Sequence, residues 1–205
     1  SSLRRIAPDF AQLDHATELW RVYFASGPFP TTWHSMRQMG PTASRFDHHL
    51  DPPGLSGPQK RGVIYVAGDP VTALAETFQD GRMIDLRRRD PWLAGFTLDT
   101  PNAPLTLLDL TGAFPTRMGA SMAIGSGPRH RAQAWARQLY NAYPGTHGIK
   151  YCSSMHANRP CFALTDRAHW AITSRARLVF NRALGDPGLL YRIKTAASRL
   201  GYAMR

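Results

Sequence analysis

Short apolar stretches alternate along the chain with longer polar segments that are rich in proline and glycine. Many of the apolar stretches carry the β-branched and aromatic side chains that strands prefer. They predict strands at residues 19–24, 63–67, 96–100, 104–110, 148–154, 161–165 and 176–180. Residues 26–62 are predicted to be mostly irregular, with 51–62 (DPPGLSGPQKRG) as a surface loop, and the Gly- and Met-rich segment 112–130 is predicted to be a loop with a short helix.

Helical periodicity appears at residues 70–79, 131–143 and 187–200. The first of these helices follows Asp69, a favourable N-cap residue, and begins at Pro70, where a missing N–H costs nothing. Its apolar stripe has the i, i+3, i+4, i+7 spacing and consists of Val71, Leu74, Ala75 and Phe78. Because Glu76 lies about 100° from that stripe on a helical wheel, periodicity alone predicts an exposed carboxylate.

The order of these elements mixes strands and helices without a regular βαβ alternation. This order favours an α+β fold over a doubly wound parallel sheet. The chain has 205 residues, contains no internal repeat and shows no linker that would divide it, so we expect one domain over 1–205.

The charge balance changes the picture more than the overall composition does. The formal net charge is +11, and almost all of the positive charge is arginine, since only Lys60, Lys150 and Lys194 are lysines. Arginine suits bidentate capture of phosphates and carboxylates, so an acidic partner or ligand is expected, against the alternative of a solvated basic surface. The absence of a long apolar run and of a disulfide framework predicts a cytoplasmic protein with no membrane association and with reduced Cys152 and Cys161.

Several standard catalytic motifs are absent from the sequence, including GxGxxG, GxxxxGK[ST], HExxH and GxSxG. His48 and His49, with Asp47 and Asp51 nearby, give a weak metal signal, and we expect no metal. The segment GSGPRH at 125–130 is either a small anion-binding nest or a plain flexible loop.

A set of polar residues at the ends or in the middle of apolar strands remains to be explained. Its members are Arg21, Arg45, Tyr65, Glu76, Ser153 and Ser154. Each has an ordinary structural interpretation: an ion-pair partner, a core tyrosine, a solvated carboxylate or a serine that satisfies a turn. Arg21 lies in the middle of an apolar strand, where a charge is costly unless it has a partner or a function.

The segments that carry these residues resemble the RES domain when they are taken in order. They are LWRVY (19–23), SRFD (44–47), IYVAGDPVTALAE (64–76), LLDLTG (107–112), GIKYCSS (148–154) and CFALTD (161–166). The resemblance spans residues of about 15–180, followed by the basic helix at about 187–200. Its most specific part is the YxAxxxxxAxxE block, which ends at Glu76.

The resemblance implies a fold like the ADP-ribosyltransferase toxins, with two small sheets and flanking helices around an NAD cleft. It implies a toxin of a toxin–antitoxin system that uses NAD as a substrate and requires no metal. Carried over by motif, Glu76, Arg21 and Ser153 would be catalytic, and Arg21, Arg45, Tyr65 and Ser153 would bind NAD, with Ser154 as the alternative serine. Two departures from the family pattern concern the neighbours of Arg45: Ala43 and Ser44 replace glycines, and Asp47 places a carboxylate where it could weaken NAD binding.

The implied roles agree with the chemistry of these side chains. Arginines hold a pyrophosphate with paired, charge-assisted hydrogen bonds, and a tyrosine can stack on the nicotinamide ring. A carboxylate that binds the ribose 2′-hydroxyl stabilises the positive charge that develops as the nicotinamide–ribose bond breaks, and this is the expected role of Glu76.

Three functional hypotheses follow, and each has a feature that distinguishes it. The first is an enzyme that cleaves NAD and passes ADP-ribose to a target protein, with water or phosphate as alternative acceptors and a cognate antitoxin that blocks the cleft. The second is a basic nucleic-acid-binding protein with Trp33, Phe46 and Trp92 as stacking platforms, although the arginines are dispersed and no binding motif is present. The third is an inactive partner protein in which Glu76 or Arg45 is dispensable.

Overall fold

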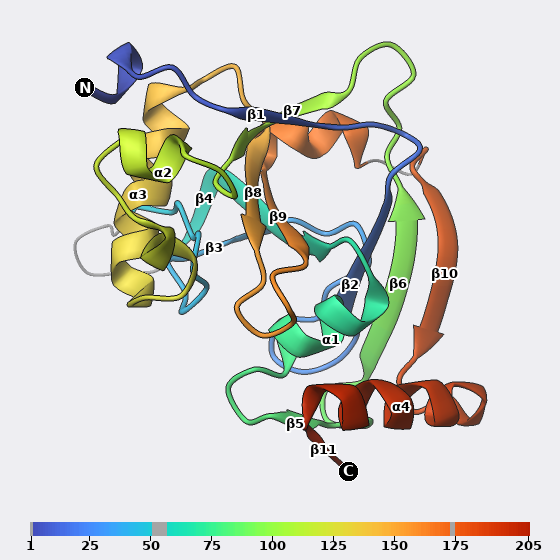
Figure 1. Cartoon of the computed structure of the whole chain (residues 1–205). Coiled ribbons are helices and arrows are strands. Elements are labelled where there is room, and N and C mark those ends of the chain that lie inside the picture. The colour runs from blue at the N-terminus through green and yellow to red at the C-terminus, as the bar shows by residue number, and fades with distance from the viewer. Residues whose placement is uncertain (1, 51–56, 173–174) are drawn as a thin grey trace.

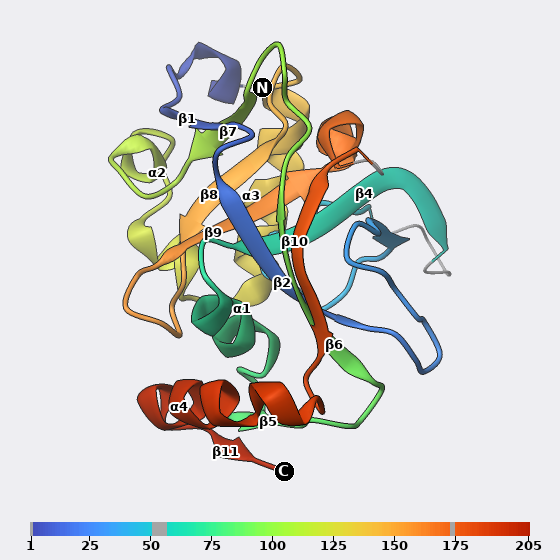
Figure 2. The same ribbon diagram turned by 90° about the vertical axis from the view of Figure 1, so that its right-hand side faces the viewer.

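The computed structural model describes residues 2–50, 57–172 and 175–205. Nine of its strands form one curled sheet, and a parallel pair of short strands forms a second one (Figures 1 and 2). The strands of the large sheet lie in the order β1-β7-β8-β9-β4-β2-β6-β10, with β3 paired to β4. Their bounds are β1 Phe10–Leu13, β2 Glu18–Phe24, β3 Arg37–Met39, β4 Pro58–Ala67, β6 Pro91–Thr97, β7 Leu105–Asp109, β8 Gly148–Cys152, β9 Pro160–Thr165 and β10 Arg177–Ala183.

The curled sheet consists of two halves that meet at a narrow join. One half contains β2, β6 and β10, and the other contains β1, β7, β8, β9, β4 and β3. Trp20 on β2 pairs with Ala67 on β4, and this is the one residue pair of the β2–β4 ladder. At the same point the Trp20 ring lies over Gly95 of β6, where a Cβ atom would come within 2.8 Å of the ring. The predicted α+β class is therefore confirmed, with the two expected small sheets present as the halves of one curled sheet.

Helices and 3-10 turns cover both faces of this sheet. The helices are α1 Pro70–Thr77, α2 Phe114–Arg117, α3 Arg129–Ala142 and α4 Leu190–Leu200, and the turns are η1 Ser2–Arg5, η2 Met122–Gly125, η3 Asp166–Ala171 and η4 Pro187–Leu189. A large core cluster joins α1, α3 and α4 to one face, and a smaller cluster lies under η3 on the other. None of the described helices is long and apolar enough to cross a membrane.

Helix α1 begins where the sequence predicts, and a side-chain cap stabilises its first turn. Asp69 accepts a hydrogen bond from the Thr72 N–H at 2.9 Å and caps the first turn. The helix ends at Thr77, two residues before the predicted end at Gln79. Beyond its last turn lie β5 (Met83–Ile84), α4 and β11 (Ala203–Met204), and these elements meet at the bottom of Figure 1.

The C-terminal segment touches α1 directly. Tyr202 is 8% exposed, and its hydroxyl donates to the Ala75 carbonyl at 3.1 Å. This hydrogen bond links the C-terminal residues to the turn of α1 that carries Glu76.

Two strand predictions were wrong in their boundaries. Residues 58–62 belong to β4 and not to a surface loop, because tertiary hydrogen bonds satisfy their polar side chains: Gln59 bonds the Gly40 and Leu50 carbonyls, and Arg61 bonds the His48 carbonyl. Residues 51–56 of that predicted loop lie outside the described part of the chain. The strand predicted at 96–100 is β6, which runs earlier, from Pro91 to Thr97.

Candidate functional site

A hydrogen bond between Glu76 and Ser153 joins two parts of the chain that are far apart in sequence. Glu76 lies in the last turn of α1, and Ser153 follows directly after β8. The Ser153 Oγ lies 2.6 Å from the Glu76 Oε1. The same Oγ accepts the N–H groups of Met155 and His156 at 3.1 and 3.0 Å, so its own proton is free to go to the carboxylate. Ser153 is 1% exposed, whereas Ser154 points to solvent, so the geometry favours Ser153 over Ser154.

The environment of Glu76 differs from the exposed position that periodicity predicts. The side chain is partly buried, and burial raises the pKa of Glu76 above its ordinary value because it disfavours the charged form. The Ser153 hydrogen bond and the positive charges of Arg45 and Arg129 oppose this shift without cancelling it. Burial therefore favours the neutral form of Glu76, and the two nearby guanidinium groups favour its charged form.

Arg45 belongs to the loop 42–49, which α3 holds in place. Gln133 of α3 donates to the Thr42 and Ser44 carbonyls at 2.6 and 2.9 Å, and the Arg45 Nη1 donates to the Gly127 carbonyl at 2.5 Å. Burial lowers the pKa of Arg45, and the neighbouring charge of Arg129 lowers it further. Two guanidinium groups thus lie near one carboxylate: Arg129 belongs to the segment 112–130, and Arg45 bonds that segment at Gly127.

The neighbours of Arg45 are structural. Phe46 is 1% exposed, and its ring packs on Tyr151 with a centroid separation of 4.7 Å. Asp47 is fully buried and accepts hydrogen bonds from Arg37 at 3.0 Å, from the Thr42 N–H at 2.7 Å and from His49 Nδ1 at 2.5 Å. Burial alone would raise the pKa of Asp47, but these bonds outweigh it and hold that pKa well below its usual range. The Asp47 carboxylate is thus turned inward to these partners, and its expected effect on NAD binding stays a prediction.

Tyr65 on β4 is a partly buried side chain whose hydroxyl oxygen is itself buried. It pairs with Ala163 of β9 and packs against the larger core cluster. Its hydroxyl oxygen is buried and has no hydrogen-bond partner in the described part of the chain. Burial and, next to it, the charge of Asp47 raise the pKa of Tyr65, so the phenol stays protonated.

Arg21 on β2 makes its described hydrogen bonds with backbone carbonyls of the segment that follows the strand. Its Nη1 donates to the carbonyls of Ser35 at 3.0 Å and Trp33 at 3.3 Å, and burial lowers its pKa to about 10. Its Nε is buried and has no hydrogen-bond partner among the described residues. No described hydrogen bond or ion pair joins Arg21 to Glu76, and the alternation along β2 places it on the face of Leu19, which belongs to the smaller core cluster. The structure therefore brings together Glu76, Ser153 and Arg45, whereas the described hydrogen bonds of Arg21 go to backbone carbonyls.

Comparison with known proteins identifies the fold that carries these residues. The sequence model of the RES domain matches residues 18–184, which is most of the chain. The protein belongs to the RES domain family. No curated protein sequence matches the chain. Among solved structures, a chain of the Mycobacterium tuberculosis MbcT–MbcA toxin–antitoxin complex is similar, with a TM-score of 0.56, 16% identity, and coverage of 90% of this chain and 92% of that chain.

The match to the RES domain ends at residue 184, so α4 and β11 lie beyond it. The predicted core of about 15–180 agrees with this range. The hydrogen bond from Tyr202 to Ala75 therefore connects a segment outside the matched region to the helix that carries Glu76.

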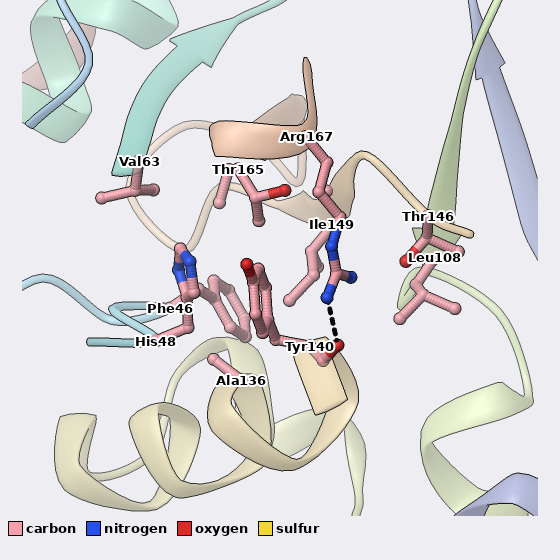
Figure 3. A pocket seen from close by; sticks show the side chains of 12 residues that line it. Phe46, His48, Val63, Leu108, Ala136, Tyr140, Thr146, Ile149, Thr165 and Arg167 are labelled. Carbon is pink, nitrogen blue, oxygen red and sulfur yellow. Dashed lines mark hydrogen bonds between the residues drawn. The ribbon is translucent and has the colours of Figure 1, made fainter. Parts of the chain in front are cut away.

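A small cavity of this RES domain lies away from these residues. It has a volume of about 10 Å³, and Figure 3 shows Phe46, His48, Tyr140 and Ile149 around it, with Arg167 donating to the Tyr140 carbonyl at 2.9 Å. This volume suits about one water molecule and is far too small for a dinucleotide. The cavity is a packing defect beneath α3, and neither Glu76 nor Ser153 lines it.

The histidines of the loop 42–49 do not form a metal centre in the described part of the chain. His49 bonds Asp47, and His48 stacks on Tyr140 with its Nε2 3.6 Å from Asp166. No group of three or more His, Cys, Asp or Glu side chains that could hold a metal occurs among the described residues. Asp51, which contributes to the sequence signal, lies outside them.

Two neighbours of Glu76 escaped the sequence reasoning. Arg129, which pairs with Asp80 at 2.6 Å, acts on both Glu76 and Arg45, and only its place in GSGPRH hinted at it. His156 bonds Thr72, one turn before Glu76 on α1. The i, i+4 spacing of Thr72 and Glu76 was visible in the sequence, but their shared contact with the loop after β8 was not.

Proposed function

We propose that this RES domain is the toxin of a toxin–antitoxin system that cleaves NAD at the nicotinamide–ribose bond and transfers ADP-ribose to a target protein in the cytoplasm. The observation that carries this proposal is the partly buried Glu76 carboxylate, which Ser153 holds at 2.6 Å beside two guanidinium groups. A fixed carboxylate stabilises a developing ribosyl cation, and fixed cations hold the phosphates of the substrate.

Glu76 acts on the ribose. Ser153 donates to its Oε1, and no described hydrogen bond occupies its Oε2. The Oε2 accepts the ribose 2′-hydroxyl, and the negative charge opposes the positive charge that builds on C1′ as the bond to nicotinamide lengthens. Ser153 keeps the carboxylate in one orientation, and its hydrogen bond favours the ionised form that this role requires.

The remaining predicted residues, together with Arg129, bind NAD in this proposal. Arg45 and Arg129 supply positive charge beside Glu76 and suit the pyrophosphate. The buried Arg21 Nε has no hydrogen-bond partner among the described residues, and this supports a role in ligand binding, because buried polar groups are costly to leave unpaired. Arg21 stays in the proposed set as a catalytic and NAD-binding residue, and Tyr65 as the residue that packs against the nicotinamide.

Two acceptors other than a protein are alternatives within the same chemistry, namely water and inorganic phosphate, which would make the toxin an NAD glycohydrolase or phosphorylase. The net charge of +11 is compatible with a phosphate-rich target protein, and transfer is preferred on this ground. The nucleic-acid alternative loses one of its three platforms, because Phe46 is 1% exposed, while Trp33 packs on Phe96 at 5.2 Å.

A cognate antitoxin is the partner that we propose for the NAD site. The support for it is family membership and the structural similarity to a chain of the MbcT–MbcA toxin–antitoxin complex. An acidic antitoxin that inserts carboxylates among Arg45 and Arg129 would compete with the NAD phosphates. Its affinity would fall steeply with salt, and an affinity that did not change with salt would contradict this interface.

Product analysis tests the proposed function. The purified protein is incubated with NAD labelled in its adenosine half, first in buffer, then with phosphate, then with a bacterial lysate. Label that moves onto protein, with release of nicotinamide, supports transfer. Free ADP-ribose or its phosphate ester would point to water or phosphate as the acceptor, and intact NAD in all three reactions would contradict the proposal.

A further inference from the structure

Helix α1 makes two side-chain contacts with the loop 153–159 between β8 and β9, one from each of two successive turns. Glu76 bonds Ser153 at 2.6 Å, and Thr72 bonds the Nδ1 of His156 at 2.7 Å. Thr72 and Glu76 are four residues apart, so they lie on one face of the helix and roughly 6 Å apart along it. The imidazole of His156 therefore meets the same face of α1 as Ser153 does, one helical turn earlier.

The hydrogen bonds around Thr72 determine which nitrogen of His156 carries the proton. The Thr72 hydroxyl donates to the Asp69 Oδ2 at 2.6 Å, since a carboxylate only accepts. Having used its proton there, the Thr72 oxygen accepts at 2.7 Å, so the Nδ1 of His156 must be the donor. In the neutral ring the Nε2 then has no proton and presents a lone pair.

The His156 ring is partly exposed and lies next to the residue that orients Glu76. Its side chain is 24% exposed, while Thr72 behind it is fully buried. Its own backbone N–H is bonded to the Ser153 Oγ at 3.0 Å, which ties the position of His156 to the residue that orients Glu76. Asp69, Thr72 and His156 thus form a chain of hydrogen bonds beside the proposed NAD site. Asp69 accepts from Thr72, Thr72 accepts from His156, and His156 presents its free Nε2 as a base.

We propose that His156 is the general base that activates a water or hydroxyl acceptor in the reaction of this site; the inference rests on the proposed function. The Nε2 takes the proton of the acceptor as its oxygen forms a bond to C1′ of the ribose. The bond from C1′ to the nicotinamide nitrogen breaks, and its electron pair returns to the ring, which leaves as neutral nicotinamide. Thr72 and Asp69 are positioning residues that hold the tautomer.

Inorganic phosphate gives this assignment a sharp test. The phosphate dianion is already an anionic nucleophile, so its attack requires no proton removal, whereas the attack of water does. Loss of a general base lowers a rate by about 10²–10⁴-fold. His156→Gln should therefore lower NAD hydrolysis by about 10²-fold or more and leave the phosphate-dependent release of nicotinamide unchanged.

The experiment compares His156→Gln with wild type in phosphate-free buffer and in phosphate, by following nicotinamide release. His15→Gln is the matched control, because His15 is exposed in the turn between β1 and β2. Thr72→Val should lower hydrolysis selectively at unchanged KM, and Thr72→Ser, which keeps the hydroxyl, should restore it. Melting temperatures of all variants report on folding.

Each outcome bears on the inference. A selective loss of hydrolysis supports it. Equal losses of hydrolysis and phosphorolysis would show a purely structural role for His156 and would overturn it, while leaving the proposed function intact. A wild-type protein that turns over NAD only with phosphate would overturn the general base as well. If wild type releases no nicotinamide under any condition, the proposed function fails and the inference fails with it.

Discussion

The bond between Ser153 and Glu76 makes a quantitative prediction about stability. Its atoms are 2.6 Å apart, and Ser153 is 1% exposed. A hydrogen bond to a charged group contributes about 1.5–3 kcal/mol. A double-mutant cycle with Glu76→Ala and Ser153→Ala should therefore give an interaction free energy of about 1.5–3 kcal/mol at a pH where the carboxyl is ionised.

The cycle is measured by urea unfolding of the wild type, the two single variants and the double variant at pH 8. Because burial raises the pKa of Glu76, the carboxyl takes up its proton at a higher pH than an exposed one does. At pH 4 the bond is then neutral, and the interaction should fall toward about 1 kcal/mol.

Ser154 provides the matched control for this cycle. It is the exposed neighbour of Ser153, so Ser154→Ala should show no coupling to Glu76→Ala. A coupling below about 0.5 kcal/mol for the Ser153 pair, the level of independent sites, would refute the reasoning that Ser153 orients the carboxylate.

Three further predictions concern single substitutions, each followed by thermal or urea unfolding. The raised pKa of Glu76 contributes stability that is present at low pH and is lost as pH rises through the folded pKa. The free energy of unfolding of Glu76→Gln, relative to that of wild type, should therefore be higher at pH 8 than at pH 4. An equal difference at both pH values would contradict this. Asp47 has a lowered pKa, so its contribution is present at neutral pH and lost in acid; Asp47→Asn should cost roughly 3–5 kcal/mol at pH 7 and less at pH 3, and a neutral effect at pH 7 would show that the Arg37 pair is dispensable. Tyr202→Phe removes the donor to the Ala75 carbonyl and should cost about 1 kcal/mol, whereas unchanged stability would show that water replaces it fully.

Local signals in the sequence predicted the elements that carry the site. Asp69 and Pro70 mark the start of α1 because capping and the missing N–H are local effects, and the structure confirms both. The apolar and β-branched content of 19–24 likewise predicted β2 within one residue. The boundary of β4 was missed because Gln59 and Arg61 look like loop residues until their distant partners are known.

The site itself depends on contacts that no local pattern contains. Ser153 and Glu76 are 77 residues apart, and periodicity cannot show that a polar helix face meets a loop. The sequence places Asp47 beside Arg45, but it does not show that Arg37 and the Thr42 N–H turn the carboxylate inward. Arg21 is grouped with Glu76 by resemblance alone, and the strand alternation only places it on the same face of β2 as Leu19.

The release of nicotinamide from NAD by the wild type and by Glu76→Gln tests the central claim most directly. The substitution keeps the size of the side chain and an acceptor for Ser153 while removing the charge. The account predicts that wild type releases nicotinamide and that the variant, still folded, loses about 10²-fold or more of that rate, as the loss of an electrostatic stabiliser usually costs. Equal rates in the two proteins would contradict the assignment of Glu76, and no release by either protein, with or without a protein acceptor, would contradict the claim that this RES domain acts on NAD.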